Sequence, residues 1–167
     1  MSDFPLRARR SVLYVPASNE KAQAKLASLA CDSVVIDLED AVAPEQKEAA
    51  RERMRTFLTG PQRPGCEVVV RVNGLSTPDF TEDLLAAVAC RPDAILLPKV
   101  DGPRDIRDID LALDEMDAPR RLMLWAMIET PKAMLNIGAI AELGRDNAAR
   151  LACFVAGTND LIKDTGV

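Results

Sequence analysis

The sequence predicts an α/β fold of parallel strands, each followed by a helix, and three observations support this prediction. Short apolar runs alternate with amphipathic stretches of helical period. The apolar runs begin near positions 11, 34, 67, 94, 122 and 151, which is the spacing of successive βα units. Several runs also end in a charged residue, at the strand edge where such folds bind ligands.

The predicted elements follow this alternation. Six strands are expected, over Val12–Pro16, Val34–Asp37, Glu67–Asn73, Ala94–Pro98, Leu122–Glu129 and Leu151–Ala156. Helices are expected over Lys21–Ala30, Pro44–Leu58, Asp79–Ala89, Pro103–Met116 and Lys132–Leu143, with a further turn or two after Gly157.

Local signals mark the first three units. Pro16 stops the first strand, and Ser18 or Asn19 can cap the helix that follows. The second strand ends in the acidic run DLED, after which Pro44 can open a helix. The run EVVVRVN is rich in β-branched residues, as strands are, and Thr77 before a proline can begin the third helix.

Similar signals mark the last three units. Pro92 breaks the third helix, and the strand AILLP leads to Lys99. The run LMLWAMI is apolar without alternation, which predicts a strand buried on both faces. It ends in Glu129, after which Thr130 can cap a helix and Pro131 can occupy its first position.

The strand ends favour a barrel over an open doubly wound sheet. The first strand-to-helix junction, VPASNEK, has no glycine, and no dinucleotide or P-loop motif is present. Polar residues follow five of the six strands, as the mouth of a barrel requires. We therefore predict a TIM (β/α)8-type barrel in a single domain spanning residues 1–167, with about six βα units present.

Because eight units need roughly 200 residues or more, our hypothesis is that the chain is part of a longer protein. Alone it would expose unpaired edges at the first and sixth strands, an aggregation liability.

Composition narrows the function classes. The net charge is −5 and the basic residues are scattered, which argues against nucleic-acid binding. No apolar run is long enough to cross a membrane, so a cytoplasmic location is expected. The chain has no histidine, which excludes Ser-His-Asp and Cys-His nucleophiles and the usual zinc sites. Any metal would be held by oxygen atoms, which favours Mg²⁺. The four cysteines show no CxxC spacing and are expected to be reduced and mostly buried.

Charged residues at the second and third strands are candidates for catalysis. Asp37 and Glu39 would share one face of an extended chain and point into the mouth together. The alternative is an acidic turn that caps the next helix, which suits Asp40. Arg71 lies within an apolar strand, where a guanidinium needs a partner. It can bind a substrate carboxylate, form an ion pair with Asp37 or Glu39, or do both.

Two later carboxylates form a candidate metal pair. Glu129 and Asp160 follow the fifth and sixth strands, which would be neighbours, and a bound Mg²⁺ would explain two close like charges. The alternative for Asp160 is an acidic residue in the first turn of a helix, favoured there by the macrodipole. Lys99 is a weaker candidate that could simply be exposed.

Six motifs in order resemble one known family. RRSVLYVPASNEK, DLEDAV, VRVN, LPKV, MIETP and GTNDL resemble the citrate lyase β-subunit-like members of the HpcH/HpaI aldolase and citrate lyase family, within the phosphoenolpyruvate-binding TIM-barrel superfamily. The resemblance runs from Arg10 to the end of the chain. It implies that Glu129 and Asp160 bind Mg²⁺, and that Arg71 engages the carboxylate or carbonyl oxygen of the substrate. It also places the acidic DLED cluster behind the metal and its waters.

The resemblance implies further substrate-binding residues. Arg10 matches a position near the entrance for coenzyme A, and Lys99 matches a residue of the barrel mouth. The backbone of Gly157 and Thr158 would lie beside the bound acid. In several relatives the catalytic carboxylate comes from a C-terminal segment, often that of a neighbouring subunit.

The implied activity is a Mg²⁺-dependent carbon–carbon lyase. It would cleave or form a citryl-, malyl- or citramalyl-CoA-type thioester, giving acetyl-CoA and a 2-oxo acid. The alternatives are a malyl-CoA thioesterase, a 2-oxo-acid aldolase, or a catalytically silent subunit that binds a dicarboxylate. The implied partners are a small 2-oxo acid and a CoA thioester, with homo-oligomers such as the trimers or hexamers of relatives.

Overall fold

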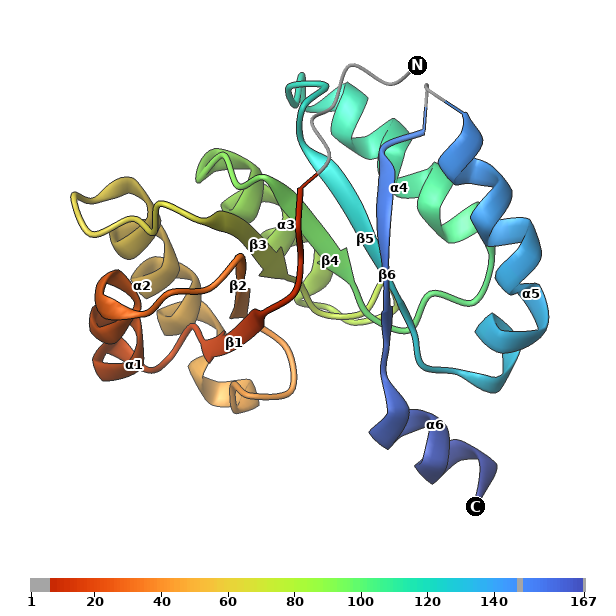
Figure 1. Cartoon of the computed structure of the whole chain (residues 1–167), viewed down its shortest axis with the longest axis horizontal. Helices are drawn as coiled ribbons and strands as arrows, with labels where there is room; N and C mark the ends of the chain where they lie inside the picture. Colours follow the sequence, from red (N-terminus) through yellow and green to blue (C-terminus); the bar gives the residue numbers. More distant parts are fainter. Residues whose placement is uncertain (1–6, 147–148, 167) are drawn as a thin grey trace. The chain divides into compact units, whose positions relative to one another are not determined.

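The computed structural model describes residues 7–146 and 149–166, which alternate between strands and helices (Figure 1). The strands are β1 (Val12–Pro16), β2 (Ser33–Asp37), β3 (Glu67–Arg71), β4 (Ala94–Leu97), β5 (Met123–Ile128) and β6 (Leu151–Ala156). The α-helices are α1 (Glu20–Lys25), α2 (Lys47–Thr59), α3 (Phe80–Ala89), α4 (Pro103–Glu115), α5 (Pro131–Glu142) and α6 (Thr158–Thr165). Short 3₁₀ helices cover Leu26–Ser28, Pro44–Gln46 and Leu143–Arg145.

The order of the strands supports the predicted fold class. They form a sheet in the order β1-β2-β3-β4-β5-β6, so neighbours in sequence are neighbours in the sheet. The pairs β1–β2, β2–β3 and β5–β6 are parallel. A doubly wound sheet reverses its strand order at a switch point, whereas a barrel does not. The predicted α/β, barrel-type fold with six βα units is therefore confirmed.

The described residues divide into two compact units, a first up to Ile95 and a second from Leu96 onward. The predicted single-domain organisation stays a prediction. In the first unit, every residue of β2 and β3 is buried, and α2 contributes Met54 and Phe57 to the core. In the second unit, β5 is buried from Leu124 onward, as its unbroken apolar run predicts.

The ends of several elements differ from the predictions. Asn19, rather than Ser18, caps α1, since its side-chain oxygen accepts from the Ala22 amide at 3.0 Å. The helix expected from Lys21 to Ala30 tightens into a 3₁₀ turn at Leu26. The third strand ends at Arg71 rather than Asn73, because the Asn73 amide bonds the Asp83 side chain instead of a neighbouring strand.

The start of α5 matches the prediction. Thr130 caps the helix, with its hydroxyl oxygen accepting from the Ala133 amide at 3.0 Å, and Pro131 is the first helical residue. This junction fixes the backbone just after β5, where Glu129 lies. Within residues 7–146 and 149–166, no helix combines the length and the apolar character needed to cross a bilayer.

Candidate functional site

The carboxyl ends of β2 and β3 bring Arg71 onto the acidic DLED run. Asp37 and Arg71 are partners in the parallel register. Arg71 Nε and Nη2 donate to the two Asp37 carboxylate oxygens at 2.7 and 2.6 Å, and Nη1 lies 2.8 Å from Glu39 Oε2. All three side chains are buried, and the guanidinium also lies over the Tyr14 ring, 5.6 Å from its centroid. The ion-pair alternative for Arg71 is therefore confirmed.

The ionised state of Arg71 follows from this arrangement. Burial lowers the pKa of the guanidinium, but the hydrogen bonds to Asp37 and the charges of Asp37, Glu39 and Asp40 outweigh burial and raise it above its ordinary value. Arg71 is therefore a fixed cation at the carboxyl end of β3.

Asp37 organises the backbone of the DLED turn. Besides the Arg71 bonds, its oxygens accept from the backbone amides of Glu39 at 2.9 Å and Ala41 at 3.3 Å. This carboxylate thus holds the turn in shape, while Glu39 presents a second carboxylate to the guanidinium. Asp40 lies 3.5 Å from Arg71 with a largely exposed side chain. The alternative that Asp40 caps the next helix is wrong, because Ala43 is the N-cap residue of the helical turn that follows.

Lys47, a buried residue that the sequence did not single out, stabilises the same turn. Lys47 is only 8% exposed, and its ammonium donates to the carbonyl oxygens of Leu38 and Glu39, both at 2.7 Å, and to Asn73 Oδ1 at 2.8 Å. All three donor hydrogens of the ammonium are thus engaged. Lys47 therefore fixes the backbone that carries Glu39.

The network continues from Asn73 into α3. Asp83 is fully buried and accepts from the Asn73 amide at 2.9 Å and from Arg51 at 3.0 Å. Arg51 also bonds Asp79 at 3.1 Å. These side chains connect the β2 and β3 ends to the helices packed behind them. The one sequence signal for this network is the polar Asn73 at the end of a β-branched run.

We expect Lys47→Met to lower the free energy of unfolding by about 2–3 kcal/mol, because it removes three hydrogen bonds that a buried ammonium makes to the DLED turn and to Asn73. Urea unfolding followed by circular dichroism measures this change. Lys21→Met is the matched control, since Lys21 is exposed on α1 and its loss should change stability by less than about 0.5 kcal/mol. Equal stability of the two variants would contradict a supporting role for Lys47.

The second unit holds Glu129 at the carboxyl end of β5. Its side chain is 1% exposed, and Oε1 accepts from the backbone amide of Lys99 at 2.7 Å. Gly157 lies against the same side chain, and a Cβ placed there would come 2.5 Å from Glu129 Cβ and still closer to Oε2. The Gly157 amide donates to the Ile128 carbonyl at 3.1 Å, which fixes this approach. Glu129 is therefore a buried carboxylate with a defined position.

Lys99 contributes through its backbone in this structure. Its φ of 53° is in the left-handed region, which costs a non-glycine residue about 1–2 kcal/mol. The conformation directs the amide at Glu129, while the side chain is exposed. The exposed side chain is the alternative that the sequence left open.

Lys99→Gly tests which part of this residue matters. Glycine adopts positive φ at little cost, so stability should stay within about 1 kcal/mol of wild type, and any response to Mg²⁺ should be retained. Lys99→Ala keeps the backbone strain but removes the charge, and it should also retain the response. Thermal melts with and without Mg²⁺ compare them. Loss of the response in both variants would assign the function to the ammonium.

Asp160 lies three residues after Gly157, in the first turn of α6. Its side chain is half-buried, and Thr158, the first residue of α6, is exposed. The structure thus brings the Glu129 side chain and the start of α6 together at Gly157. Among residues 7–146 and 149–166, no group of three or more Asp, Glu, Cys or His side chains could hold a metal ion. A cation here would have to take its remaining ligands from water and a bound molecule.

Arg10 lies apart from the candidate residues at the carboxyl ends of the strands. It precedes β1, and its guanidinium and backbone amide bond the Asp32 carboxylate, which precedes β2. These bonds lower the pKa of Asp32 to about 2. Since β1 and β2 are parallel, this pair lies at the amino-terminal edge, whereas Asp37 and Arg71 lie at the other. The predicted coenzyme A contact of Arg10 stays a prediction.

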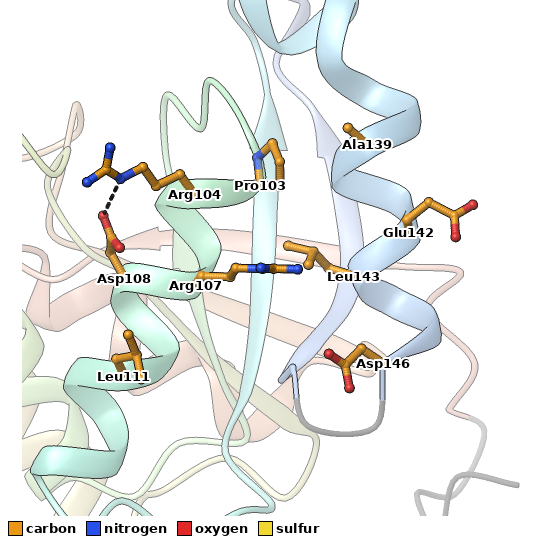
Figure 2. Close-up of a pocket in the computed structure, with 9 residues that line it drawn as sticks. All are labelled: Pro103, Arg104, Arg107, Asp108, Leu111, Ala139, Glu142, Leu143 and Asp146. Carbon is orange, nitrogen blue, oxygen red and sulfur yellow. Dashed lines mark ion pairs between the residues drawn. The ribbon is translucent and has the colours of Figure 1, made fainter.

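A groove of about 710 Å³ is lined by residues of α4 and of α5 with the turn that follows it (Figure 2). Arg104 and Asp108 on α4 form an ion pair at 3.7 Å on one side, and Glu142 and Leu143 belong to the other. Figure 2 shows Arg107 extending from α4 toward Leu143. None of the predicted site residues lines this groove, so it gives no support to a catalytic role.

The chain is similar to several known proteins. The chain is 41% identical over 157 residues to the (3S)-malyl-CoA thioesterase of Cereibacter sphaeroides, covering 94% of this chain and 51% of the relative. It is 31% identical to a malyl-CoA/beta-methylmalyl-CoA/citramalyl-CoA lyase of Chloroflexus aurantiacus, covering 99% and 49%. The crystal structure of protein CitE of Mycobacterium tuberculosis, in complex with magnesium and acetoacetate, superposes with a TM-score of 0.73 at 30% identity, covering 95% and 59%.

The chain spans about half the length of the curated relatives it matches. Those relatives are a thioesterase and a lyase that act on CoA esters, and the solved neighbour was crystallised with magnesium. The sequence profile of the HpcH/HpaI aldolase/citrate lyase family matches residues 10–167, which is nearly the whole chain. With its sequence, strand order and relatives in agreement, the chain belongs to the HpcH/HpaI aldolase/citrate lyase family.

Proposed function

We propose that this chain carries the Mg²⁺- and acid-binding part of a carbon–carbon lyase. The reaction would cleave or form a citryl-, malyl- or citramalyl-CoA-type thioester, giving acetyl-CoA and a 2-oxo acid. The observation that carries the proposal is Glu129, a carboxylate that is 1% exposed and held against Gly157 at the end of β5. A carboxylate at the carboxyl end of a parallel strand lies at the edge where such folds bind ligands, and its oxygens are ligands that Mg²⁺ prefers.

The side chains of the second unit fit a hard divalent cation. Glu129 and Asp160 supply carboxylate oxygens, which Mg²⁺ prefers. Proteins often bind Mg²⁺ through one or two carboxylates, with water and substrate oxygens completing the shell. A site with two protein carboxylates is therefore sufficient. A Cβ on residue 157 would clash with the Glu129 side chain, so glycine at this position lets the carboxylate keep its place. When bound, Mg²⁺ would supply Lewis-acid stabilisation for the oxygens of a 2-oxo acid.

The residues of this unit would orient the acid. The Lys99 amide keeps the Glu129 carboxylate in one position, so that little reorganisation is needed when a ligand binds. The backbone amides at the start of α6, including that of Thr158, are donors suited to a carboxylate. We assign Gly157 and Thr158 to this contact.

In the first unit, we assign charge stabilisation to Arg71. Its fixed cation would favour the enolate oxygen that develops when the carbon–carbon bond breaks. Asp37 would hold the guanidinium in place through its two hydrogen bonds, and Glu39 would be a second carboxylate at the same strand ends. The catalytic roles of Asp37 and Glu39, and the substrate contact of Arg71, are parts of this proposal.

Thioester hydrolysis is the second candidate, and the 41% identity to a malyl-CoA thioesterase favours it. The two activities give different products from malyl-CoA. Carbon–carbon cleavage releases acetyl-CoA and a 2-oxo acid, whereas hydrolysis releases malate and the free thiol of coenzyme A. An aldolase acting without coenzyme A would release neither CoA product.

Ligand-dependent stabilisation is the first test of the proposal. A ligand that binds only the native state raises the melting temperature, so Mg²⁺ with oxaloacetate or pyruvate should raise it, and EDTA should reverse the rise. Chromatography of products from malyl-CoA then separates acetyl-CoA from free coenzyme A. A shift without products would identify a silent dicarboxylate-binding subunit. No shift at saturating Mg²⁺ and acid would contradict the proposal.

Glu129→Gln tests the metal assignment within that experiment. The amide is nearly isosteric and can still accept from Lys99, so the fold should be retained while the Mg²⁺-dependent rise is lost. Glu142→Gln is the matched control, because Glu142 is an exposed residue of α5. A Glu129→Gln variant that keeps the full Mg²⁺ response would contradict the assignment.

Homo-oligomer formation and a cytoplasmic location stay predictions.

A further inference from the structure

Two cysteines meet at the amino-terminal edge of the first unit. Cys31 precedes β2 and Cys66 immediately precedes β3, and their sulfur atoms lie 3.8 Å apart. They are separated by 35 positions in sequence, so spacing gives no sign of the contact. The pair lies at the opposite strand ends from Asp37 and Arg71 and takes no part in the proposed function.

The backbone around the pair is fixed by sheet pairing. Ser33 and Glu67 are register partners, and the Glu67 amide donates to the Asp32 carbonyl at 3.2 Å. Continued by one residue, this register places Cys66 opposite Asp32, so Cys31 is offset by one position. Strands about 4.8 Å apart with a rise of about 3.3 Å per residue bring the two Cα atoms within the separation of about 4.4–6.8 Å that disulfides need. The sulfur atoms need to approach by a little under 2 Å to reach the bonding distance of about 2.05 Å. Rotation of the two half-buried side chains can supply such a movement.

The surroundings of the two thiols allow reaction with a small oxidant. Both are half-buried, whereas Cys90 is buried, so the expectation of mostly buried cysteines is wrong. Burial, followed by the hydrogen bond and charge of Cys31, raises the pKa of Cys66 to about 11. Cys66 is therefore the natural proton donor of the pair, and Cys31 the first sulfur to react.

We propose that Cys31 and Cys66 form an oxidisable dithiol, at which a hydroperoxide converts two thiols into an intramolecular disulfide. The Cys31 thiolate attacks hydrogen peroxide, whose O–O bond breaks to give a sulfenic acid and, after proton uptake, water. The Cys66 sulfur then displaces the sulfenic hydroxyl, which leaves as a second water with the Cys66 proton. In total, two thiols are oxidised, one peroxide is reduced, and one S–S bond forms.

The cross-link would join the beginnings of two neighbouring strands. Closing a loop across 35 positions removes conformations from the unfolded chain, so the oxidised protein should melt at a higher temperature. Because the linked residues precede β2 and β3, the bond leaves the strand ends that carry Asp37 and Arg71 in their register. The dithiol is thus a modification site separate from Arg71 and its carboxylate partners Asp37 and Glu39.

Peptide mapping of the peroxide-treated full chain tests the proposal. The protein is reduced, freed of reductant, treated with equimolar hydrogen peroxide and digested with trypsin without reduction. Cleavage should place Cys31 in the peptide of residues 26–47 and Cys66 in that of residues 56–71, because the bond after Arg63 precedes a proline and resists trypsin. We expect these two peptides to be joined, and dithiothreitol to separate them and reverse the rise in melting temperature.

Matched variants complete the test. Cys31→Ser and Cys66→Ser should each abolish the joined peptide and the rise, whereas Cys153→Ser, in the second unit, should retain both. Three results would overturn the proposal: oxidation of Cys31 to sulfinic acid without a cross-link, a disulfide between two chains, or a joined peptide involving Cys90 or Cys153 instead.

Discussion

Arg71→Met is expected to lower the free energy of unfolding by about 3–5 kcal/mol, because it removes the cation from two buried carboxylates. Asp37 would lose two hydrogen bonds of 2.7 and 2.6 Å, and Glu39 would lose a charge partner at 2.8 Å. Neither carboxylate is more than 6% exposed, so water cannot readily replace the guanidinium. Urea unfolding at neutral pH measures the loss.

Arg71→Lys separates charge from geometry. A lysine keeps the positive charge, but it cannot make the two parallel bonds to Asp37 and reach Glu39 as well. Its stability should therefore fall between those of wild type and Arg71→Met. Arg104→Met is the surface control, since that side chain is 91% exposed and should be nearly neutral. A wild-type unfolding curve for Arg71→Met would show that the buried ion pairs contribute nothing.

Gly157→Ala is expected to abolish the Mg²⁺-dependent thermal shift and to destabilise the protein by about 1–3 kcal/mol. The new methyl group would come 2.5 Å from Glu129 Cβ, and its approach to Oε2 would be closer. Since the Gly157 amide is bonded to the Ile128 carbonyl, the glutamate side chain must move instead. Melting curves recorded with and without Mg²⁺ and oxaloacetate report both effects.

Gly138→Ala is the control for that substitution. Gly138 is exposed in α5, and an added Cβ would meet nothing within 4 Å beyond the backbone of its own helix. Alanine in a helix interior should therefore stabilise the protein by up to about 1 kcal/mol. Its Mg²⁺ response should equal that of wild type. If Gly157→Ala behaves in the same way, the close packing of Gly157 on Glu129 has no functional importance.

The segment around Glu129 was the most predictable part of the chain. Each residue type there favours one place in the structure: the apolar run favours a buried strand, Thr130 the N-cap and Pro131 the first turn of a helix. These preferences agree on a strand-to-helix junction at Glu129. The pairing of Arg71 with Asp37 could also be anticipated, because a guanidinium within a buried strand requires a carboxylate. Local rules were sufficient in both cases.

Other contacts depend on tertiary structure that local rules do not contain. Lys47 is the first residue of a helix rich in charged residues, so its side chain is expected to be solvated. In the structure its ammonium instead donates to two carbonyl oxygens of the DLED turn. The charge of Lys99 suggests a role for its side chain, but its backbone amide makes the contact with Glu129. This contact depends on a positive φ, which the sequence does not predict. The Cys31–Cys66 contact depends on the register of β2 and β3.

Glu129 and Asp160, the carboxylates that follow β5 and β6, are expected to hold a divalent cation. Mn²⁺ can replace Mg²⁺ in such sites and is visible by anomalous X-ray scattering. A crystal grown with Mn²⁺ and oxaloacetate should show one strong anomalous peak bonded to Glu129 and Asp160, with metal–oxygen distances of about 2.1 Å. A crystal saturated with both ligands that shows no peak there, or shows the ion bound to other residues, would contradict the claim.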